Sequence, residues 1–139
     1  MMMQGLGQLD VLIGEWITTS NTYSNGRGYT TVTRTEDGKF LRIDSREEDD
    51  RFPHSTQLVG ADESCDECTV LYYDSRGVHR VYHMTVVGGV WKIWRQAPGF
   101  SQRYIAEIKD GGNTIEGWWE MSEDGERWRV DFDLTYRKK

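Results

Sequence analysis

The side chains that could do chemistry are concentrated between residues 78 and 95. Two strand-like runs, Val78–Val86 and Val90–Arg95, flank Gly88 and Gly89, and two consecutive glycines between such runs predict a tight β-hairpin. Cationic, aromatic and titratable side chains lie on both runs: Arg80, Tyr82, His83, Lys92, Trp94 and Arg95. A strand that only packed into a core would not need so many hydrogen-bond donors. The hairpin therefore predicts one wall of a polar and aromatic cavity.

Successive side chains of a strand point to opposite faces, so Arg80 and Tyr82 share one face and His83 lies on the other. If the first face points inward, Arg80 and Tyr82 would offer a cation and a phenol to an acid or carbonyl group. An inward arginine without a partner costs several kcal/mol. Asp131 or Glu107 could supply that partner within the protein, so an internal ion pair is the alternative to a ligand contact.

A second group of candidates flanks the loop after the hairpin. Trp94 could stack on a flat ligand, and either Arg95 or Arg103 on the next strand could hold a carboxylate through two hydrogen bonds. The alternative is that Trp94 packs in the core and both arginines lie on the rim. Trp118 and Trp119 must point to opposite faces of their strand, and we include Trp118 among the ligand-binding candidates.

The histidines do not form a metal-binding pattern. His79 and His83 share a strand face, but four residues of strand separate their Cα atoms by roughly 13 Å, which is too far for one ion. We therefore predict no metal site and no cofactor. A haem needs only one axial histidine, and His83 or His79 could provide it.

One Cys-x-x-Cys sequence, Cys65 to Cys68, lies in an acidic connection between two strands. A single such motif could be a redox pair or half of a zinc site. The neighbouring carboxylates disfavour the thiolate. Incidental thiols in a turn and a reversible disulfide both remain open.

Length and charge bound the class of protein. A chain of 139 residues suits one domain, residues 1–139. The net charge of −6 and a pI near 5.1 argue against binding to nucleic acid or to an anionic membrane. No apolar run reaches the ~20 residues of a membrane helix, and the first residues lack the features of a signal peptide. We predict a cytoplasmic protein, monomeric or homodimeric, whose partner is a small-molecule ligand.

The chain must position these residues mainly with strands. Apolar spacing predicts one short helix over Leu6–Ile13, which Gly14 would end. Ten strand-like runs separated by short turns follow: Glu15–Ser20, Tyr29–Glu36, Lys39–Glu48, Thr56–Ala61, Thr69–Asp74, Val78–Val86, Val90–Arg95, Ser101–Lys109, Thr114–Met121 and Glu126–Tyr136. Short turns join antiparallel neighbours, and closure of the sheet removes its edges. We predict an all-β, ten-stranded antiparallel up-and-down β-barrel with one short N-terminal helix.

The start of the first strand resembles a known group of barrels. Gly14, Glu15 and Trp16 follow the predicted helix and are similar to the Gly-x-Trp opening of lipocalins and the wider calycin superfamily. The resemblance implies that Trp16 plugs the closed end of the barrel. It also implies that Arg137, at the end of the last strand, packs over that tryptophan.

The chain also resembles a family of short bacterial lipocalin-like proteins of unknown function. Five segments carry this resemblance: Leu9–Trp16, Phe40–Asp44, Asp74–Met84, Trp91–Gln102 and Asp131–Tyr136. It implies the fold and no particular activity. The neighbouring nitrobindins are ten-stranded haem barrels with a histidine ligand on a late strand. No histidine follows His83 here, so the resemblance to nitrobindins is one of fold.

These observations predict a binding barrel without enzymatic activity. Its interior would hold a partly apolar or aromatic ligand that carries an acid or carbonyl group. One alternative is a small enzyme, an isomerase, cyclase or hydrolase, in which Tyr82 or His83 beside Arg80 does acid–base work in the same polar cavity. The second alternative is a haem-binding, nitrobindin-like protein.

Overall fold

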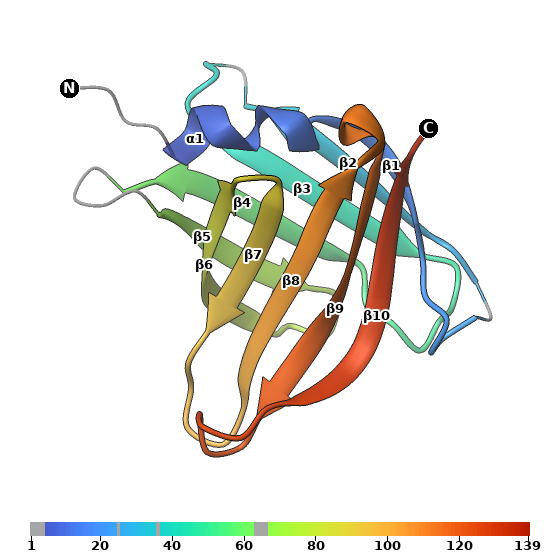
Figure 1. Ribbon diagram of the computed structural model, residues 1–139, viewed down its shortest axis with the longest axis vertical. Coiled ribbons are helices and arrows are strands. Elements are labelled where there is room, and N and C mark those ends of the chain that lie inside the picture. Colours follow the sequence, from blue (N-terminus) through green and yellow to red (C-terminus); the bar gives the residue numbers. More distant parts are fainter. Residues whose placement is uncertain (1–4, 25, 36, 63–66) are drawn as a thin grey trace.

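In the computed structural model of the protein, ten strands form one closed antiparallel barrel (Figure 1). The structure describes residues 5–24, 26–35, 37–62 and 67–139. Each strand pairs with its neighbours in the sequence, and β1 pairs with β10 to close the ring. The strands are β1 Gly14–Thr19, β2 Gly28–Arg34, β3 Leu41–Glu47, β4 Ser55–Ala61, β5 Cys68–Asp74, β6 His79–Val87, β7 Val90–Arg95, β8 Ser101–Lys109, β9 Thr114–Ser122 and β10 Arg129–Lys138. The predicted fold class is confirmed.

Alternation of inward and outward side chains makes these segments strands of a barrel. In β5, Val70 is completely buried, whereas its neighbour Leu71 is 57% exposed on the outer face. The predicted hairpin turn between β6 and β7 lies at Gly88 and Gly89, which have φ angles of 60° and 76°. Positive φ at both central residues is what such a turn requires, and glycine adopts it without a steric penalty.

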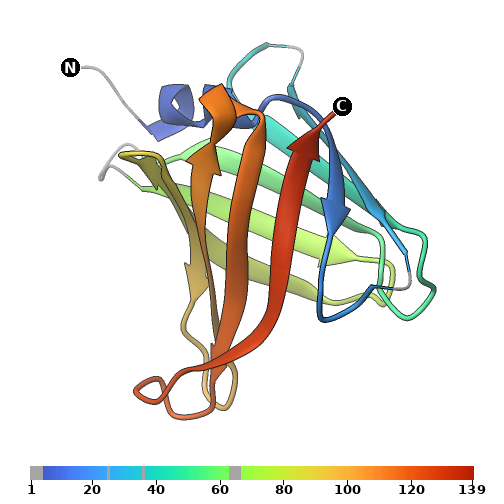
Figure 2. The ribbon, with the colours of Figure 1, turned by 45° about the vertical axis from the view of Figure 1, so that its right-hand side comes forward.

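The N-terminal helix lies across one end of the barrel (Figures 1 and 2). It consists of α1, Gly5–Gln8, and a 3₁₀ turn η1, Leu9–Leu12, whose two leucines are buried. The prediction that Gly14 ends the helix was wrong, because the backbone is already extended at Ile13. Gly14 instead opens β1 with a φ of 140°, and a Cβ there would lie 2.8 Å from the Lys138 side chain.

Trp16 plugs this end of the barrel, as the lipocalin resemblance implies. The side chain is 2% exposed, and its indole N–H donates a 2.8 Å hydrogen bond to the carbonyl of Leu12. The residue over the ring is Lys138, whose Nζ lies 5.2 Å from the ring centroid, so the expectation of Arg137 was wrong. Lys138 is the cross-strand partner of Trp16, and Arg137 therefore points outward, where it donates to the Thr19 hydroxyl.

A continuous series of aromatic contacts extends from the plug toward the open end. Tyr136 contacts both Trp16 and Trp91, with centroid separations of 6.3 and 5.2 Å. Tyr104 connects Trp91 to Trp119 through separations of 5.4 and 5.5 Å. Edge and tilted contacts between rings add to the free energy of simple burial. Trp16, Trp91 and Tyr104 fill the closed half of the barrel, and Tyr136 and Trp119 carry the series to the cavity in the open half.

A bulge interrupts the alternation of inward and outward side chains in β10. Val130 pairs with Glu120 and is 61% exposed, whereas Phe132 pairs with Trp119 and faces inward. Asp131 is the extra residue between them. A bulge inserts one residue on one strand and reverses the inward and outward sides beyond it.

We expect Trp16→Ala to lower the free energy of unfolding by about 3–5 kcal/mol, because it empties the plug and removes a buried hydrogen bond. Urea denaturation followed by circular dichroism measures this change. Trp118→Ala is the matched control, because that tryptophan is 46% exposed on the outer face. Its cost should stay below about 1 kcal/mol. Equal losses in the two variants would contradict the role of Trp16 as the plug.

Candidate functional site

The open half of the barrel contains a cavity of about 450 Å³. Aromatic rings from β5, β6, β9 and β10 and from two loops form much of its wall: Phe52, Tyr72, Tyr82, Phe100, Trp119, Phe132 and Tyr136. Small polar side chains from β1 to β4 line the other side: Thr18, Thr30, Ser45, Glu47, Ser55 and Gln57. The cavity thus has an aromatic side and a hydroxyl-rich side.

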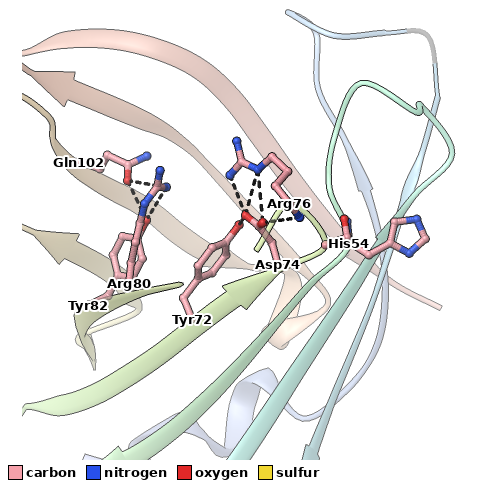
Figure 3. A network of polar contacts seen from close by, with 8 residues as sticks. His54, Tyr72, Asp74, Arg76, Arg80, Tyr82 and Gln102 are labelled. Atoms are coloured by element: carbon pink, nitrogen blue, oxygen red, sulfur yellow. Dashed lines mark hydrogen bonds and ion pairs between the residues drawn. The ribbon is translucent and has the colours of Figure 1, made fainter. Parts of the chain in front are cut away.

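Arg80 lies in this cavity with Tyr82 and Gln102 (Figure 3). The Tyr82 hydroxyl donates a 2.7 Å hydrogen bond to Oε1 of Gln102. The Arg80 guanidinium reaches both of these oxygens at 3.5 Å, at the limit of a hydrogen bond, and lies 5.7 Å from the Phe100 ring centroid. Among the residues that the structure describes, no carboxylate forms an ion pair with Arg80.

The predicted internal partners of Arg80 are therefore not its partners. Glu107 is exposed and lies on the outward face of β8, one residue out of phase with the inward Tyr104 and Ala106. Asp131 is the bulged residue of β10. Neither carboxylate reaches the guanidinium, so the cation in the cavity keeps its charge without a neutralising anion from the described chain.

A second arginine at the mouth of the cavity is neutralised. Asp74 accepts hydrogen bonds from Nη2 of Arg76 and from the Tyr72 hydroxyl, both at 2.6 Å (Figure 3). The Arg76 hydrogen bond, followed by that of Tyr72, holds the pKa of Asp74 well below its usual range despite burial. Burial and the Asp74 charge raise the pKa of Tyr72. Arg80 thus differs from Arg76, whose charge Asp74 already balances.

Arg95 lies next to the same group of residues. It is the cross-strand partner of Gln102, and its guanidinium lies 6.0 Å from the Tyr82 ring centroid. Of the seven candidates from the sequence, Arg80 and Tyr82 line the cavity and Arg95 lies beside them.

The other four candidates lie on the outer surface of the barrel. His83, Trp94 and Arg103 are cross-strand neighbours on β6, β7 and β8, and the rings of His83 and Trp94 stack at 5.6 Å. Arg103 forms an ion pair with Glu120 and lies 4.0 Å from the Trp128 ring centroid. Trp118 is on the same outer surface, 46% exposed. Each of the four adjoins an inward residue in the sequence, so alternation directs it outward.

Most of the cavity lining was missing from the sequence prediction, including Gln102, Glu47 and Trp119. Strand register could have identified Gln102. Pairing of the hairpin places Arg95 opposite the inward Tyr82, and Arg95 in turn pairs with Gln102, so Gln102 also points inward. Trp119 could not be distinguished from Trp118 by alternation alone. Glu47 was missed because it stands in the acidic run Glu47–Asp50, which is typical of solvated surface, although it is in phase with the buried Leu41 and Ile43 of its strand.

Glu47 is the one acidic side chain among the described residues that line the cavity. Burial, and secondarily the charge of Asp49, raise the pKa of Glu47 to about 7. Within the described chain its carboxylate has no hydrogen bond and no ion pair to offset the loss of hydration. A carboxyl group in this condition can accept a hydrogen bond from a ligand or exchange a proton near neutral pH.

All three histidines, His54, His79 and His83, are exposed, and none lines the cavity. The alternative of a haem held by an axial histidine therefore gains no support. Within the described residues, no three His, Cys, Asp or Glu side chains gather as a metal site. Cys68 is buried at the start of β5, and Cys65 lies outside the described residues, so the fate of the Cys-x-x-Cys motif stays a prediction.

Comparison with known proteins leaves the family open. No protein-family model matches the sequence, and no curated protein matches it. The closed ten-stranded antiparallel barrel is compatible with a lipocalin-like, calycin fold. No helix of the described chain has the length and apolar character to cross a membrane.

The raised pKa of Glu47 predicts a pH-dependent effect on stability. An acid whose pKa rises on folding destabilises the folded state progressively as pH rises from its unfolded value of 4.5 to about 7. We expect Glu47→Gln to stabilise the protein by about 1 kcal/mol more at pH 8 than at pH 5, after allowance for solvent screening. Urea denaturation at both pH values measures this difference.

Glu126→Gln, in the exposed loop between β9 and β10, is the control and should change stability equally at the two pH values. A Glu47→Gln effect that is constant with pH, or that reverses sign, would contradict burial as the cause.

Proposed function

We propose that the protein is a small-molecule-binding barrel whose ligand is partly apolar or aromatic and carries an acid or carbonyl group. The observation that carries this proposal is Arg80, a cation that lines the cavity without a carboxylate partner among the described residues. Its contacts with Tyr82 and Gln102 are both 3.5 Å long. Such weak contacts leave the guanidinium donors available to a better acceptor.

The geometry around Arg80 suits an acid or a carbonyl group. Guanidinium pairs with a carboxylate through two parallel hydrogen bonds, which are stronger than neutral ones. Oε1 of Gln102 accepts a hydrogen bond from the Tyr82 hydroxyl, so the amide N–H groups of Gln102 are available as donors to a ligand. Arg95 adds a second positive charge near the Tyr82 ring. An anionic or carbonyl oxygen here would have several donors around it.

The rest of the cavity suits an apolar or aromatic body. Trp119 and Tyr82 contact each other at 6.1 Å, and Tyr72 extends this surface at 5.8 Å. Phe132 and Phe100 line the same cavity from β10 and from the loop before β8. A volume of about 450 Å³ lies within the range of sites for small organic molecules.

A small enzyme is the second candidate, and one observation favours it. Glu47 combines a place in the cavity with a pKa of about 7, which suits a general acid or base at neutral pH. Chemical conversion of a compound that co-purifies with the protein would establish this alternative. Release of the compound unchanged supports a binding protein.

The leading proposal predicts a specific effect of removing the Arg80 charge. Arg80→Met should weaken binding of 3-(4-ethylphenyl)propanoate by about tenfold or more, because a charge-assisted hydrogen bond contributes about 1.5–3 kcal/mol. Binding of the neutral alcohol 3-(4-ethylphenyl)propan-1-ol should change little. Isothermal titration calorimetry measures both affinities.

Arg103→Met is the matched control, because Arg103 lies on the outer surface with Glu120. It should leave both affinities unchanged. If Arg80→Met and Arg103→Met bind the acid equally well, Arg80 does not recognise the ligand. Native mass spectrometry of freshly purified protein provides an independent test, since a bound acid should appear as a mass that denaturation releases.

A further inference from the structure

Four residues in register across four adjacent strands form a row on the interior wall, which we call the Glu47 row. Tyr136 on β10 pairs with Thr18 on β1, Thr18 pairs with Gly28 on β2, and Gly28 pairs with Glu47 on β3. All but Gly28 line the cavity described above, and Gly28 lines the small recess that continues it. Thr18 and Glu47 thus flank Gly28, and Tyr136 lies beyond Thr18.

Gly28 allows the side chains on both sides to approach its backbone. A Cβ at Gly28 would lie 2.0 Å from Oγ1 of Thr18 and 2.8 and 2.9 Å from the two carboxylate oxygens of Glu47. The hydroxyl and the carboxylate therefore occupy the space over this one residue. Any other residue at position 28 would displace them, which makes glycine part of how the row is built.

Among the described residues, no side chain forms a hydrogen bond with the oxygens of the Glu47 row. Within the described chain, the Glu47 carboxylate, the Thr18 hydroxyl and the Tyr136 hydroxyl form no side-chain hydrogen bond. Thr18 is nevertheless only 4% exposed. Burial and then the charge of Glu47 raise the pKa of Tyr136. In the described chain the buried side-chain polar atom without a partner is Nε1 of Trp91, so the three groups of the row lie against the open cavity, where a ligand can supply the partner that the protein does not.

We infer that the Glu47 row binds a primary ammonium group, so that the ligand of the barrel carries an amine at one end and an acid at the other. This inference rests on the proposed function. An ammonium group has three N–H donors and no acceptor. The row offers it three acceptor groups, one carboxylate and two hydroxyls. Asp49 adds negative charge near the row, although Arg51 pairs with it.

The position of the row relative to Arg80 completes the inference. The row is centred on β1 and β2, and β2 lies halfway around the ring of strands from β7. Arg80 and Gln102 stand on β6 and β8, the two neighbours of β7. A cationic anchor and an anionic anchor therefore face each other across the cavity, with aromatic rings between them. The class of ligand that fits is a zwitterionic aryl compound with separated amine and carboxylate groups.

The test compares matched probe pairs by isothermal titration calorimetry at pH 8. Each pair consists of a 4-(aminomethyl)phenyl acid and the 4-ethylphenyl acid of equal shape. The three pairs differ in the acid chain, which is acetate, propanoate or butanoate. For at least one chain length, wild-type protein should bind the amine on the order of tenfold more tightly. Glu47→Gln should abolish this preference and keep the affinity for the ethyl acid. Thr18→Val should reduce the preference in part.

Glu48→Gln is the control, because Glu48 is the exposed neighbour of Glu47 and bonds to Tyr29. It should keep the preference for the amine. If every ethyl acid binds at least as tightly as its amine, the ammonium site is refuted while the acid-binding proposal stands. An undiminished preference in Glu47→Gln also refutes it. If neither member of any pair binds, the proposed function fails, and the inference fails with it.

Discussion

The constraint on which this structure depends is the twofold alternation of side chains in a closed antiparallel sheet. Once β1 pairs with β10, every strand has one interior face, and the register of each pair aligns interior residues in rows around the ring. At the closed end, the hydrogen bond from Trp16 to the Leu12 carbonyl holds the plug against the N-terminal helix. Rows of interior residues near the plug form the core, and rows farther from it line the cavity.

The two halves of the barrel divide the tasks of stability and recognition. Near the plug, Trp91, Tyr104 and Met84 are buried and fill the interior. Toward the mouth, the inward positions change to arginine, glutamine, glutamate and hydroxyl side chains around open space. A charge without a partner in a packed core would be costly, and these charges lie where a ligand or water can reach them. The unbalanced cation Arg80 and the unbalanced acid Glu47 thus stand on facing walls.

The sequence was sufficient for the fold and for part of the site. Turn residues such as Gly88 and Gly89 and the alternation of the strands identified all ten strands, and they placed Arg80 and Tyr82 on one face. The errors arose where a single-residue shift exchanges the two faces. Lys138 covers Trp16 in place of Arg137, and Trp119 lines the cavity in place of Trp118. Glu47 escaped notice because it begins an acidic run, although alternation from the buried Leu41 and Ile43 directs it inward.

The most direct test of the central claim, that recognition takes place inside the barrel, is a map of chemical shifts. A ¹H–¹⁵N NMR titration with 3-(4-ethylphenyl)propanoate would report on both faces of the same strands. The structure predicts changes at the backbone amides of Tyr82 and Gln102 and at the indole of Trp119, with little change at the outward Trp94 and Trp118 indoles. Changes confined to these outer tryptophans would contradict it.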